Sequence, residues 1–579
     1  PRRKGLGGVD PGVMPGTVHV AVDRYRPTTT VDAADYVPEL SVILGDSVAR
    51  ANGRSRCTGE QYSAGREVGR ASLLGQWDLT PARLRTQSLR HLLCGARRIL
   101  LHALYLPGVV NRAPSGMFDP VQDFPPGFDL QPWWEHMAVL SNELFEVSKF
   151  LEEGKPVRSV ALLYPLADLW AGPVDATSAH LFGTWAQALD KAGCPFVIID
   201  ESQLVKGEIE VSVTTMILPG VGWLEHAASF AALQAFGAQE DHEILASAVG
   251  EAALVPLCGT AVSGGGTVLE NVLRGVKEDA ITAEAWRLAA GLRNVARLSS
   301  PDQLGTILRD PTQKPPLYGR IAWHRLSDSS SRDRLAIQNE IGQWRELILG
   351  ASEKPRNLRV WESVPEKRAG QSQSDRTWRS WGTIPAGEAI AVRVRPHEML
   401  CLEWEESRGS EALEDVSEWM PSSQGPVIRL TDGWQFAEDQ QNVWRPIDPA
   451  LSLEQQGMGG DGSGIYQIDL DSISHPDVNS DAACRWHLVI PEVRGALVCR
   501  IDDVTCGVSL TDQAVFPCPE GGSFPSGVLQ LVWRGTAASR FYKDHPPVAG
   551  ERREKSGLMG VPRLELWRSQ PRLRRLKSA

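Results

Sequence analysis

One carboxylate stands out in the stretch GRSRCTGEQYSAG, residues 53–65, where Glu60 lies among small and polar residues. A glutamate at the end of a strand can act as a general acid or base, because burial and neighbouring charges tune its pKa. Arg54, Arg56 and Arg66 are close in the sequence, and a nearby guanidinium would favour the ionised form of Glu60, which is the form a base requires. The alternative is a solvated loop carboxylate paired with arginine, an arrangement that contributes little stability.

Two further positions carry side chains that can do chemistry or bind a ring. His102 lies inside the apolar run RRILLHALYL, where a hydrogen-bonded core histidine is the ordinary interpretation and a ligand or catalytic role the alternative. Trp133 and Trp134 begin a predicted helix. Paired aromatic residues usually pack in a core, although aromatic faces at the mouth of a site also stack on sugar rings.

Three other patterns give weaker signals. The glycines at 264–266 precede a predicted helix but match neither GxGxxG nor a P-loop, which favours a plain flexible turn. The loop FDPVQDFPPGFD carries Asp119, Asp123 and Asp129, which offer oxygen ligands for calcium but lack the pattern of an EF-hand. The GxSxG motif of a serine hydrolase is absent around these three serines: Ser63, Ser72 and Ser141.

The cysteines favour free thiols. There are 9 of them, with no CxxC pair and no histidine spacing of a zinc site. The alternative is a bridge between Cys499 and Cys506 in an oxidising compartment, which depends on a geometry that sequence does not show.

Composition limits the class of protein. The chain has 579 residues, 42% hydrophobic and 23% charged, which predicts a folded protein of three or four domains. The net charge of −11 argues against a nucleic-acid binder, and the basic tail RLRRLKSA is expected to be a solvated terminus. No stretch reaches the roughly 20 apolar residues of a membrane helix, so we expect no membrane partner. The start PRRKGLGGVD carries no signal-peptide pattern and predicts a processed product or a fragment; the compartment and the oligomeric state stay open.

The elements that must position Glu60 and His102 follow from periodicity. The segment AADYVPELSVILGDSVARANG predicts a helix that ends at Asn52 and Gly53. In DLTPARLRTQSLRHLLCG, a cap at Asp78 or Thr80, a proline in the first turn and a leucine face predict a second helix that ends at Gly95. The apolar run that contains His102 follows as a buried strand. Helix followed by strand predicts a parallel α/β sheet.

The alternation of helices and strands continues in later segments and ends at about residue 315. A helix over PWWEHMAVLSNELFEVSKFLEEG, a strand at VRSVALLYPL and a strand, helix, strand series through TTMILPG predict a second, doubly wound α/β unit, with VSGGGTVLENVLRGV as a turn that opens a helix. From about residue 315, short β-rich segments between turns predict β-sandwich modules.

The ordered motifs ANGRSRCTGEQYSAG, WDLTPARLR, GARRILLHALYLPG, LQPWWEHMAVLSNEL and FLEEGKPVRSVALLYPL resemble the last strands and helices of the barrel in glycoside hydrolase family 106, the α-L-rhamnosidases, and the start of the Rossmann-like domain that follows it. GSGIYQIDLD, WHLVIPEVRGALVCRIDD and SGLMGVPRLELW look like the jelly-roll sugar-binding module shared with family 2 glycosidases. This resemblance covers about residues 40–260 and 425–568. It implies α/β plus all-β architecture in four parts: a partial (α/β)8 barrel at 1–155, a Rossmann-like domain at 156–310, a β-sandwich at 311–410 and a jelly-roll, galactose-binding-like domain at 425–570.

For the site, the resemblance implies an inverting glycosidase with two carboxylates, a carbohydrate substrate and a calcium ion near the sugar. Glu60 falls on the acidic residue that follows ANGR and is the candidate catalytic carboxylate. His102 and Tyr105 fall at the next strand end, as candidates for the wall of the substrate pocket. Trp77 and Trp133 are the candidate aromatic contacts. No metal ligand is assigned.

The chain also departs from the family pattern. About 150 residues precede the Rossmann-like segment, fewer than the roughly 250 of a complete barrel, and the second carboxylate is not evident. Asp502 and Asp503 replace the Asn-Gly turn of the sugar-binding module, which puts its affinity in question. Two alternatives therefore stay open: a non-catalytic carbohydrate-binding or scaffold relative, and a β-galactosidase-like glycosidase.

Overall fold

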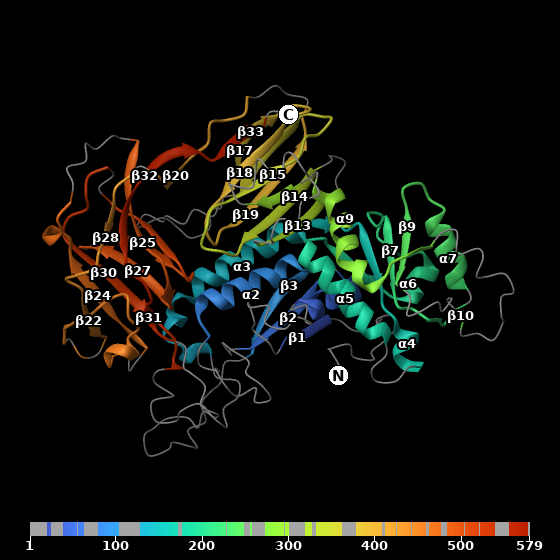
Figure 1. The fold of residues 1–579 in the computed structure, drawn as a ribbon, viewed down its shortest axis with the longest axis horizontal. Coiled ribbons are helices and arrows are strands. Elements are labelled where there is room, and N and C mark those ends of the chain that lie inside the picture. Colours follow the sequence, from blue (N-terminus) through green and yellow to red (C-terminus); the bar gives the residue numbers. More distant parts are fainter. Residues whose placement is uncertain are drawn as a thin grey trace, which may run out of the picture.

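The structure is a computed structural model (Figure 1), with helices and strands in several packed layers. It describes the following residues: 20–24, 39–54, 56–62, 79–102, 128–171, 177–226, 228–247, 255–256, 273–293, 296–299, 319–326, 332–361, 378–407, 412–423, 425–439, 441, 443–458, 462–475, 483–502, 504–519, 522–538 and 555–576.

The first layer is a three-stranded parallel sheet in the order β1-β2-β3. Its strands are β1 (Val20–Arg24), β2 (Cys57–Tyr62) and β3 (Ala96–His102). Helix α1 (Leu40–Ala51) connects β1 to β2, and α2 (Pro81–Leu93) connects β2 to β3. Parallel strands that are neighbours in both the sequence and the sheet, and that are connected by helices, form βαβ units.

The end of α1 and both ends of α2 lie where the sequence predicts. Asn52 caps the end of α1, and Gly53 follows with a φ of 65°. The Thr80 hydroxyl accepts a hydrogen bond from the Arg83 amide at 3.3 Å and caps the start of α2, ahead of a proline at its first turn. Gly95 follows α2 with a φ of 122°, and a Cβ placed there would lie 2.4 Å from the carboxyl carbon of Asp46. A glycine is therefore required by both conformation and space.

Helices α2 and α3 (Met137–Glu152) form a second layer, which a third layer of strands covers. A 3-10 turn at Pro132–His136 precedes α3. The third layer is the six-stranded sheet β17-β16-β19-β14-β13-β4. Its strands are β4 (Gly154–Pro156), β13 (Gly319–Leu326), β14 (Arg332–Asn339), β16 (Arg356–Trp361), β17 (Trp378–Ile384) and β19 (Met399–Glu406). One buried cluster joins leucines of α2 and α3 to Ala336 and Cys401 of this sheet. The sheet therefore packs on the side of the two helices that faces away from β1–β3.

The predicted alternation after residue 156 forms a five-stranded parallel sheet in the order β11-β9-β7-β5-β6. Its strands are β5 (Val160–Leu163), β6 (Phe196–Ile199), β7 (Thr215–Pro219), β9 (Glu243–Ser247) and β11 (Leu273–Gly275). Helices α5 (Thr177–Ala192) and α9 (Ile281–Arg293) pack on one face, and α6 (Glu201–Lys206) and α7 (Ala228–Gly237) on the other. The prediction of a helix after the glycines at 264–266 is wrong at its end, where β11 forms; the glycines themselves lie outside the described residues.

Most of the remaining strands form two antiparallel sandwiches; β8 and β10, and β26 and β31, form separate two-stranded sheets. The first packs the six-stranded sheet against β12-β15-β18-β33, whose strands are Ala296–Ser299, Arg345–Leu349, Ala389–Val394 and Leu573–Leu576. The second, on the left of Figure 1, packs β20-β32-β25-β29 against β23-β22-β24-β30-β27-β28 around the core that contains Trp486 and Trp533. The bounds of its main strands are β20 (Ser417–Pro421), β22 (Gln435–Glu438), β24 (Ser463–Asp469), β25 (Cys484–Ile490), β27 (Ala496–Ile501), β28 (Val504–Ser509), β29 (Ala514–Pro517), β30 (Val528–Arg534) and β32 (Arg563–Pro571).

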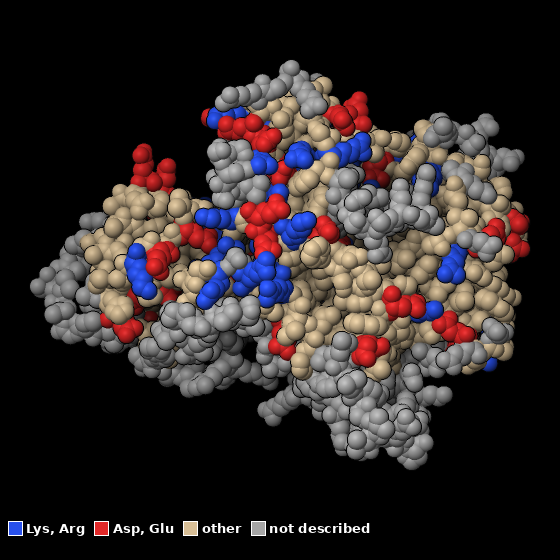
Figure 2. All heavy atoms as spheres, turned by 180° about the vertical axis from the view of Figure 1, so that it is seen from behind, with Lys and Arg blue, Asp and Glu red and all other residues tan. Residues whose placement is uncertain are grey.

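Charge on the described surface is mixed. Figure 2 shows Lys and Arg side chains interspersed with Asp and Glu on one face of the molecule. Lys354 and Glu406, 2.8 Å apart, are one exposed pair of opposite charges. Among the described residues, no helix combines the length and the apolar character needed to cross a membrane.

Candidate active site

The two faces of β2 have different surroundings. A Cβ at Gly59 would lie 2.7 Å from Nδ1 of His91 on α2. The amide of Gln61 accepts a hydrogen bond from the Ser88 hydroxyl at 2.8 Å, and its nitrogen lies 3.0 Å from the same His91 ring nitrogen. Since side chains alternate along a strand, Gly59 and Gln61 mark the helix face, and Glu60 lies on the opposite face. Glu60 is half-buried and lies two residues before the end of β2.

Strand β3 shows the same division, which corrects the prediction of a buried strand. Ile99 and Leu101 pack against the core that holds α2 and α3. On the other face, Arg98 is exposed, the Leu100 side chain is 51% exposed and His102 is half-buried. A continuous apolar run therefore forms a strand with one open face. We call the side of β1–β3 on which no described helix packs the open face.

The register brings the predicted residues together on the open face. Glu60 pairs with Leu100, and the flanking pairs are Thr58 with Arg98 and Tyr62 with His102. Neighbouring strands lie ~4.8 Å apart and each residue rises ~3.3 Å, so the Cα atoms of Arg98 and His102 each lie about 8 Å diagonally from that of Glu60. Carboxylate, guanidinium and imidazole thus occupy one face within reach of one small ligand.

A second acidic residue lies beside Glu60, and the sequence analysis missed it. Asp23 on β1 is the register partner of Glu60 in the parallel β1–β2 pair. The backbone position of Asp23 is therefore next to that of Glu60 across the β1–β2 pair. The available signal was the short apolar run VHVAV immediately before Asp23, which is too brief for periodicity to distinguish it from the surrounding loop.

The arginines near Glu60 in the sequence lie elsewhere in the structure. Arg56 precedes β2 and forms an ion pair with Glu152 at the end of α3. Arg54 is exposed in the turn after α1, and Arg66 lies outside the described residues. The interpretation that Arg56 favours an ionised Glu60 is therefore wrong, because Arg56 lies at the opposite end of the strand and binds another carboxylate. Arg98, on the open face, is the arginine that the register places near Glu60.

Trp133 lies in the core. Its side chain is 1% exposed, its indole nitrogen donates to the Leu79 carbonyl at 2.8 Å, and its ring meets that of Phe128 edge-on at 6.4 Å. This position favours the packing interpretation over sugar stacking. Trp77 and Tyr105 lie outside the described residues.

Of the three candidate calcium ligands, only Asp129 lies within the described residues. Asp129 is exposed in the 3-10 turn Phe128–Leu130, while Asp119 and Asp123 lie outside the described residues. Within the described part of the chain, no group of three or more His, Cys, Asp or Glu side chains is arranged to hold a metal ion. The calcium ion therefore stays a prediction from the family resemblance.

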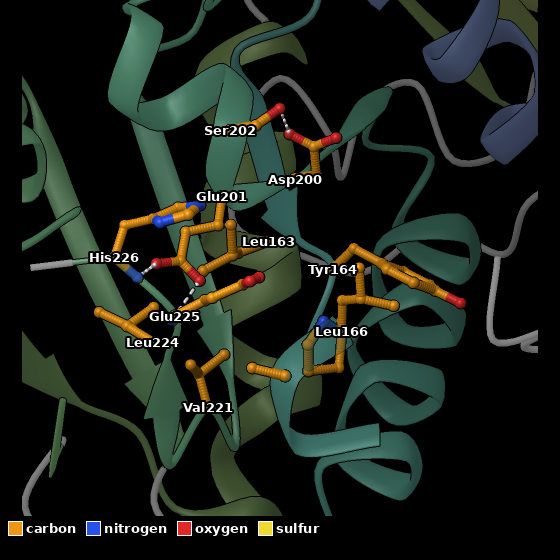
Figure 3. A pocket seen from close by; sticks show the side chains of 12 residues that line it. Leu163, Tyr164, Leu166, Asp200, Glu201, Ser202, Val221, Leu224, Glu225 and His226 are labelled. Carbon is orange, nitrogen blue, oxygen red and sulfur yellow. Dashed lines mark hydrogen bonds between the residues drawn. The ribbon is translucent and has the colours of Figure 1, made fainter. Parts of the chain in front are cut away.

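A concave region lies at the carboxyl ends of β5, β6 and β7 (Figure 3). Its hollow, about 460 Å³ including the open mouth, is lined by Leu163, Leu166, Val221 and Leu224 together with Asp200 and Glu201. The Glu201 carboxylate accepts the backbone amides of Glu225 at 2.8 Å and His226 at 2.6 Å. These bonds, drawn in Figure 3, tie β6 to the segment before α7, so Glu201 serves the fold.

Comparisons with known proteins give a fold and no family. No protein-family profile matches the sequence, and no curated protein matches it. The structure is similar to a rhamnosidase from Novosphingobium sp. PP1Y, with a TM-score of 0.55 and 13% identity over 94% of this chain. The alignment covers 51% of the rhamnosidase, so the chain spans about half the length of that protein.

Two other glycoside hydrolases match more weakly. An exo-carrageenase of family GH42 from Bacteroides ovatus gives a TM-score of 0.36 at 11% identity, covering 64% of this chain and 44% of the carrageenase. An α-L-fucosidase isoenzyme from Paenibacillus thiaminolyticus gives a TM-score of 0.35 at 13% identity, covering 63% of each chain. At these scores neither match supports a conclusion, and the rhamnosidase match at 13% identity shows a shared fold alone.

Proposed function

We propose that this chain belongs to a glycoside hydrolase of the α-L-rhamnosidase type, with Glu60 as the base that activates water. The observation that carries the proposal is the position of Glu60 on the open face of β2, two residues before the end of the strand. The fold shared with a rhamnosidase over 94% of the chain supports it.

The three parallel strands are interpreted as an arc of an (α/β)8 barrel. They lie in sequence order and their connecting helices cover one face, as in a barrel, where helices form the outer ring. The open face then corresponds to the barrel interior. Catalytic groups in such folds come from the carboxyl ends of the strands, which is where Glu60 and His102 lie.

The proposed reaction is hydrolysis of a glycosidic bond. Glu60 takes a proton from water as the oxygen attacks the anomeric carbon, and a protonated carboxylic acid on the other side gives its proton to the leaving oxygen. Asp23 is our candidate for that acid because the register places it beside Glu60. His102 and Arg98 are proposed to bind hydroxyl groups of the sugar.

The distance between the carboxyl groups of the two proposed catalytic residues, Asp23 and Glu60, bears on whether the anomeric configuration is inverted or retained. An inverting enzyme separates its carboxyl groups by roughly 6.5–9.5 Å to admit water, whereas a retaining enzyme holds them at roughly 5–5.5 Å. Backbones of neighbouring strands lie only ~4.8 Å apart, so inversion requires the two side chains to diverge. We propose inversion, following the family resemblance.

A screen of aryl glycosides tests the proposal. The longest native form of the protein is incubated with aryl α-L-rhamnoside and β-D-galactoside, with and without added calcium, and the first anomer released is identified by NMR. Hydrolysis of the rhamnoside with inversion is the expected result. Preference for the galactoside would favour the β-galactosidase-like alternative, and retention would overturn the inverting mechanism.

One observation favours a non-catalytic carbohydrate-binding protein. Among the described side chains of β2 and β3 on the open face, Glu60 is the single acid. A binding protein would retain glycans on an affinity column without releasing sugar, and that pair of results would replace the enzymatic proposal.

A further inference from the structure

Two cysteines of the C-terminal sandwich lie on neighbouring strands at an irregularity in their pairing. Cys499 is on β27 and Cys506 is on β28, the edge strand of its sheet. Cys499 pairs with Gly507, whereas the next residue, Arg500, pairs with Thr505. Cys506 is therefore the extra residue of a β-bulge. A bulge redirects the side chain of the inserted residue relative to regular alternation.

The bulge places the two cysteines on adjacent positions of neighbouring strands. Cys499 is 1% exposed inside the core of the sandwich, and Cys506 packs against that core while remaining half-buried. Each thiol lies close enough to the other to shift its pKa. Directly paired residues of antiparallel strands hold their Cα atoms roughly 4.5–5.5 Å apart, and Cys506 adjoins Gly507, the register partner of Cys499. A disulfide spans Cα atoms roughly 4.4–6.8 Å apart, a range close to this spacing.

The environments of the two thiols differ in a way that assigns them different roles. The neighbouring Cys499 thiol lowers the pKa of Cys506 against the opposing effect of burial, and the positive charge of Arg485 adds to the lowering. Burial raises the pKa of Cys499 well above its ordinary value. The thiolate is the reactive form of cysteine. Cys506 is thus the attacking sulfur, and Cys499 the one that reacts second.

We propose that Cys499 and Cys506 form a redox-active dithiol that is oxidised by thiol–disulfide exchange with a low-molecular-weight disulfide. The Cys506 thiolate attacks one sulfur of the disulfide RSSR, forming a mixed disulfide and releasing RS⁻, which takes up the proton lost by Cys506. The Cys499 sulfur then attacks the Cys506 sulfur and expels the second RS⁻, which takes up the proton of Cys499. The protein dithiol is oxidised by two electrons, and RSSR is reduced to two RSH.

The product would join the edge strand β28 to β27 across the bulge. Edge strands lack a partner on one side and open more readily than central strands. The cross-link would hold the end of the hairpin that contains Asp502, whose carboxylate accepts the Val528 amide at 2.8 Å. The dithiol would therefore set the rigidity of this corner of the sandwich.

Other described cysteines provide matched controls. Cys518 is 1% exposed and lies close enough to affect the pKa of Cys499, so it is the competing partner. Cys401 is fully buried, and Cys57 is fully buried with a pKa raised to about 12, chiefly by burial, which predicts an inert thiol.

The experiment uses the full chain with glutathione disulfide as the probe. After oxidation, free thiols are alkylated and the protein is digested and analysed by mass spectrometry. We expect the loss of two alkylatable thiols, a peptide pair joined through Cys499 and Cys506, and a rise in Tm of several degrees that dithiothreitol reverses. Cys518→Ser should behave as wild type, whereas Cys506→Ser and Cys499→Ser should each abolish the cross-link.

Three results would overturn the proposal. The first is full retention of all thiols under conditions that oxidise a model dithiol peptide. The second is glutathione remaining attached to Cys506 with no internal cross-link. The third is a bridge from Cys499 to Cys518. Because Cys499→Ser alters the core, folding of each variant is checked by its thermal transition, and Cys499→Ala replaces it if the transition is lost.

Discussion

The two parallel sheets of this molecule differ in how their faces are covered. In the five-stranded sheet, helices lie on both faces, and every residue of β5, β6 and β7 is buried. In the three-stranded sheet, helices cover one face, and the other carries the half-buried Glu60 and the 51% exposed Leu100. Among the described residues, no helix packs on this face, which leaves it accessible to a substrate. On this ground we propose the open face, rather than the hollow of Figure 3, as the place for chemistry.

Helix α1 connects these two environments. The Ser47 hydroxyl accepts the Ile198 amide of the edge strand β6 at 3.0 Å, while Asp46 binds Arg50 on its own helix at 3.0 Å and Arg158 before β5. Burial alone would raise the pKa of Asp46, but the positive charges of Arg158, Arg50 and Arg97 outweigh it and lower this pKa to about 2. Asp46 is therefore an ionised, buried link between the two sheets.

The largest expected effect comes from removing this link. Asp46→Ala leaves Arg158 and Arg97 as buried charges without their partner, which typically costs about 3–5 kcal/mol of unfolding free energy. Urea unfolding measures the loss. Glu153→Ala is the control, because Glu153 is 53% exposed in its pair with Arg334 and its removal should cost less than about 1 kcal/mol. A loss of similar size in both variants would show that Asp46 does not couple the sheets.

Two leucines measure the difference between the sheets directly. Leu162→Ala in β5, where the side chain is fully buried, should reduce the unfolding free energy by about 2–5 kcal/mol. Leu100→Ala on the open face should change it by less than about 0.5 kcal/mol. Equal losses would mean that the open face is packed against further protein, and the interpretation of it as a substrate surface would fail.

Adjacent positions on β2 repeat the comparison within a single strand. Gly59→Ala places a methyl group 2.7 Å from the His91 ring and should destabilise the protein by about 1–3 kcal/mol. Thr58→Ala, on the open face, should leave the unfolding free energy within about 0.5 kcal/mol of wild type. Thermal unfolding of the two variants would distinguish them, and a neutral Gly59→Ala would contradict the assignment of the helix face.

Acid should weaken the link between the sheets over a defined range of pH. The folded-state pKa of Asp46, about 2, is below its ordinary value of 3.8, so its stabilisation is present above pH 4 and is lost as the pH falls toward 2. The shift corresponds to about 2 kcal/mol. Denaturant titrations at pH 5 and pH 2.5 should show this loss in wild type and its absence in Asp46→Asn. An identical pH dependence in both proteins would reject the low pKa.

Local signals in the sequence were sufficient for the helices near the site and for the alternation of strands and helices. Thr80, Pro81 and Gly95 act through contacts within a few residues, so their effect on α2 is readable without tertiary knowledge. The faces of the strands were less readable. On β2, the polar Gln61 faces inward because Ser88 and His91 satisfy it, and such partners are invisible in the sequence.

The candidate site was only partly accessible to sequence reasoning for the same reason. Glu60 was identified from its segment, but its neighbours on the open face were not. The positions of Asp23 and Arg98 are brought near Glu60 by the register between strands. Register joins residues that are distant in the sequence, so it is not readable from local patterns. The apolar Leu100 was expected to be buried, whereas the sheet exposes it. The arginines closest in sequence were a poor guide, because Arg56 lies at the far end of β2 and pairs with Glu152.

The central claim is that Glu60 performs chemistry and contributes little to packing, and kinetics of Glu60→Gln measured together with its Tm test it most directly. We expect kcat on an aryl α-L-rhamnoside to fall by about 10²–10⁴-fold, the range for general acid–base groups, while Tm stays close to that of wild type. Glu152→Gln, the same change at the end of α3 where Glu152 pairs with Arg56, should keep wild-type activity. An unchanged kcat in Glu60→Gln would contradict the claim.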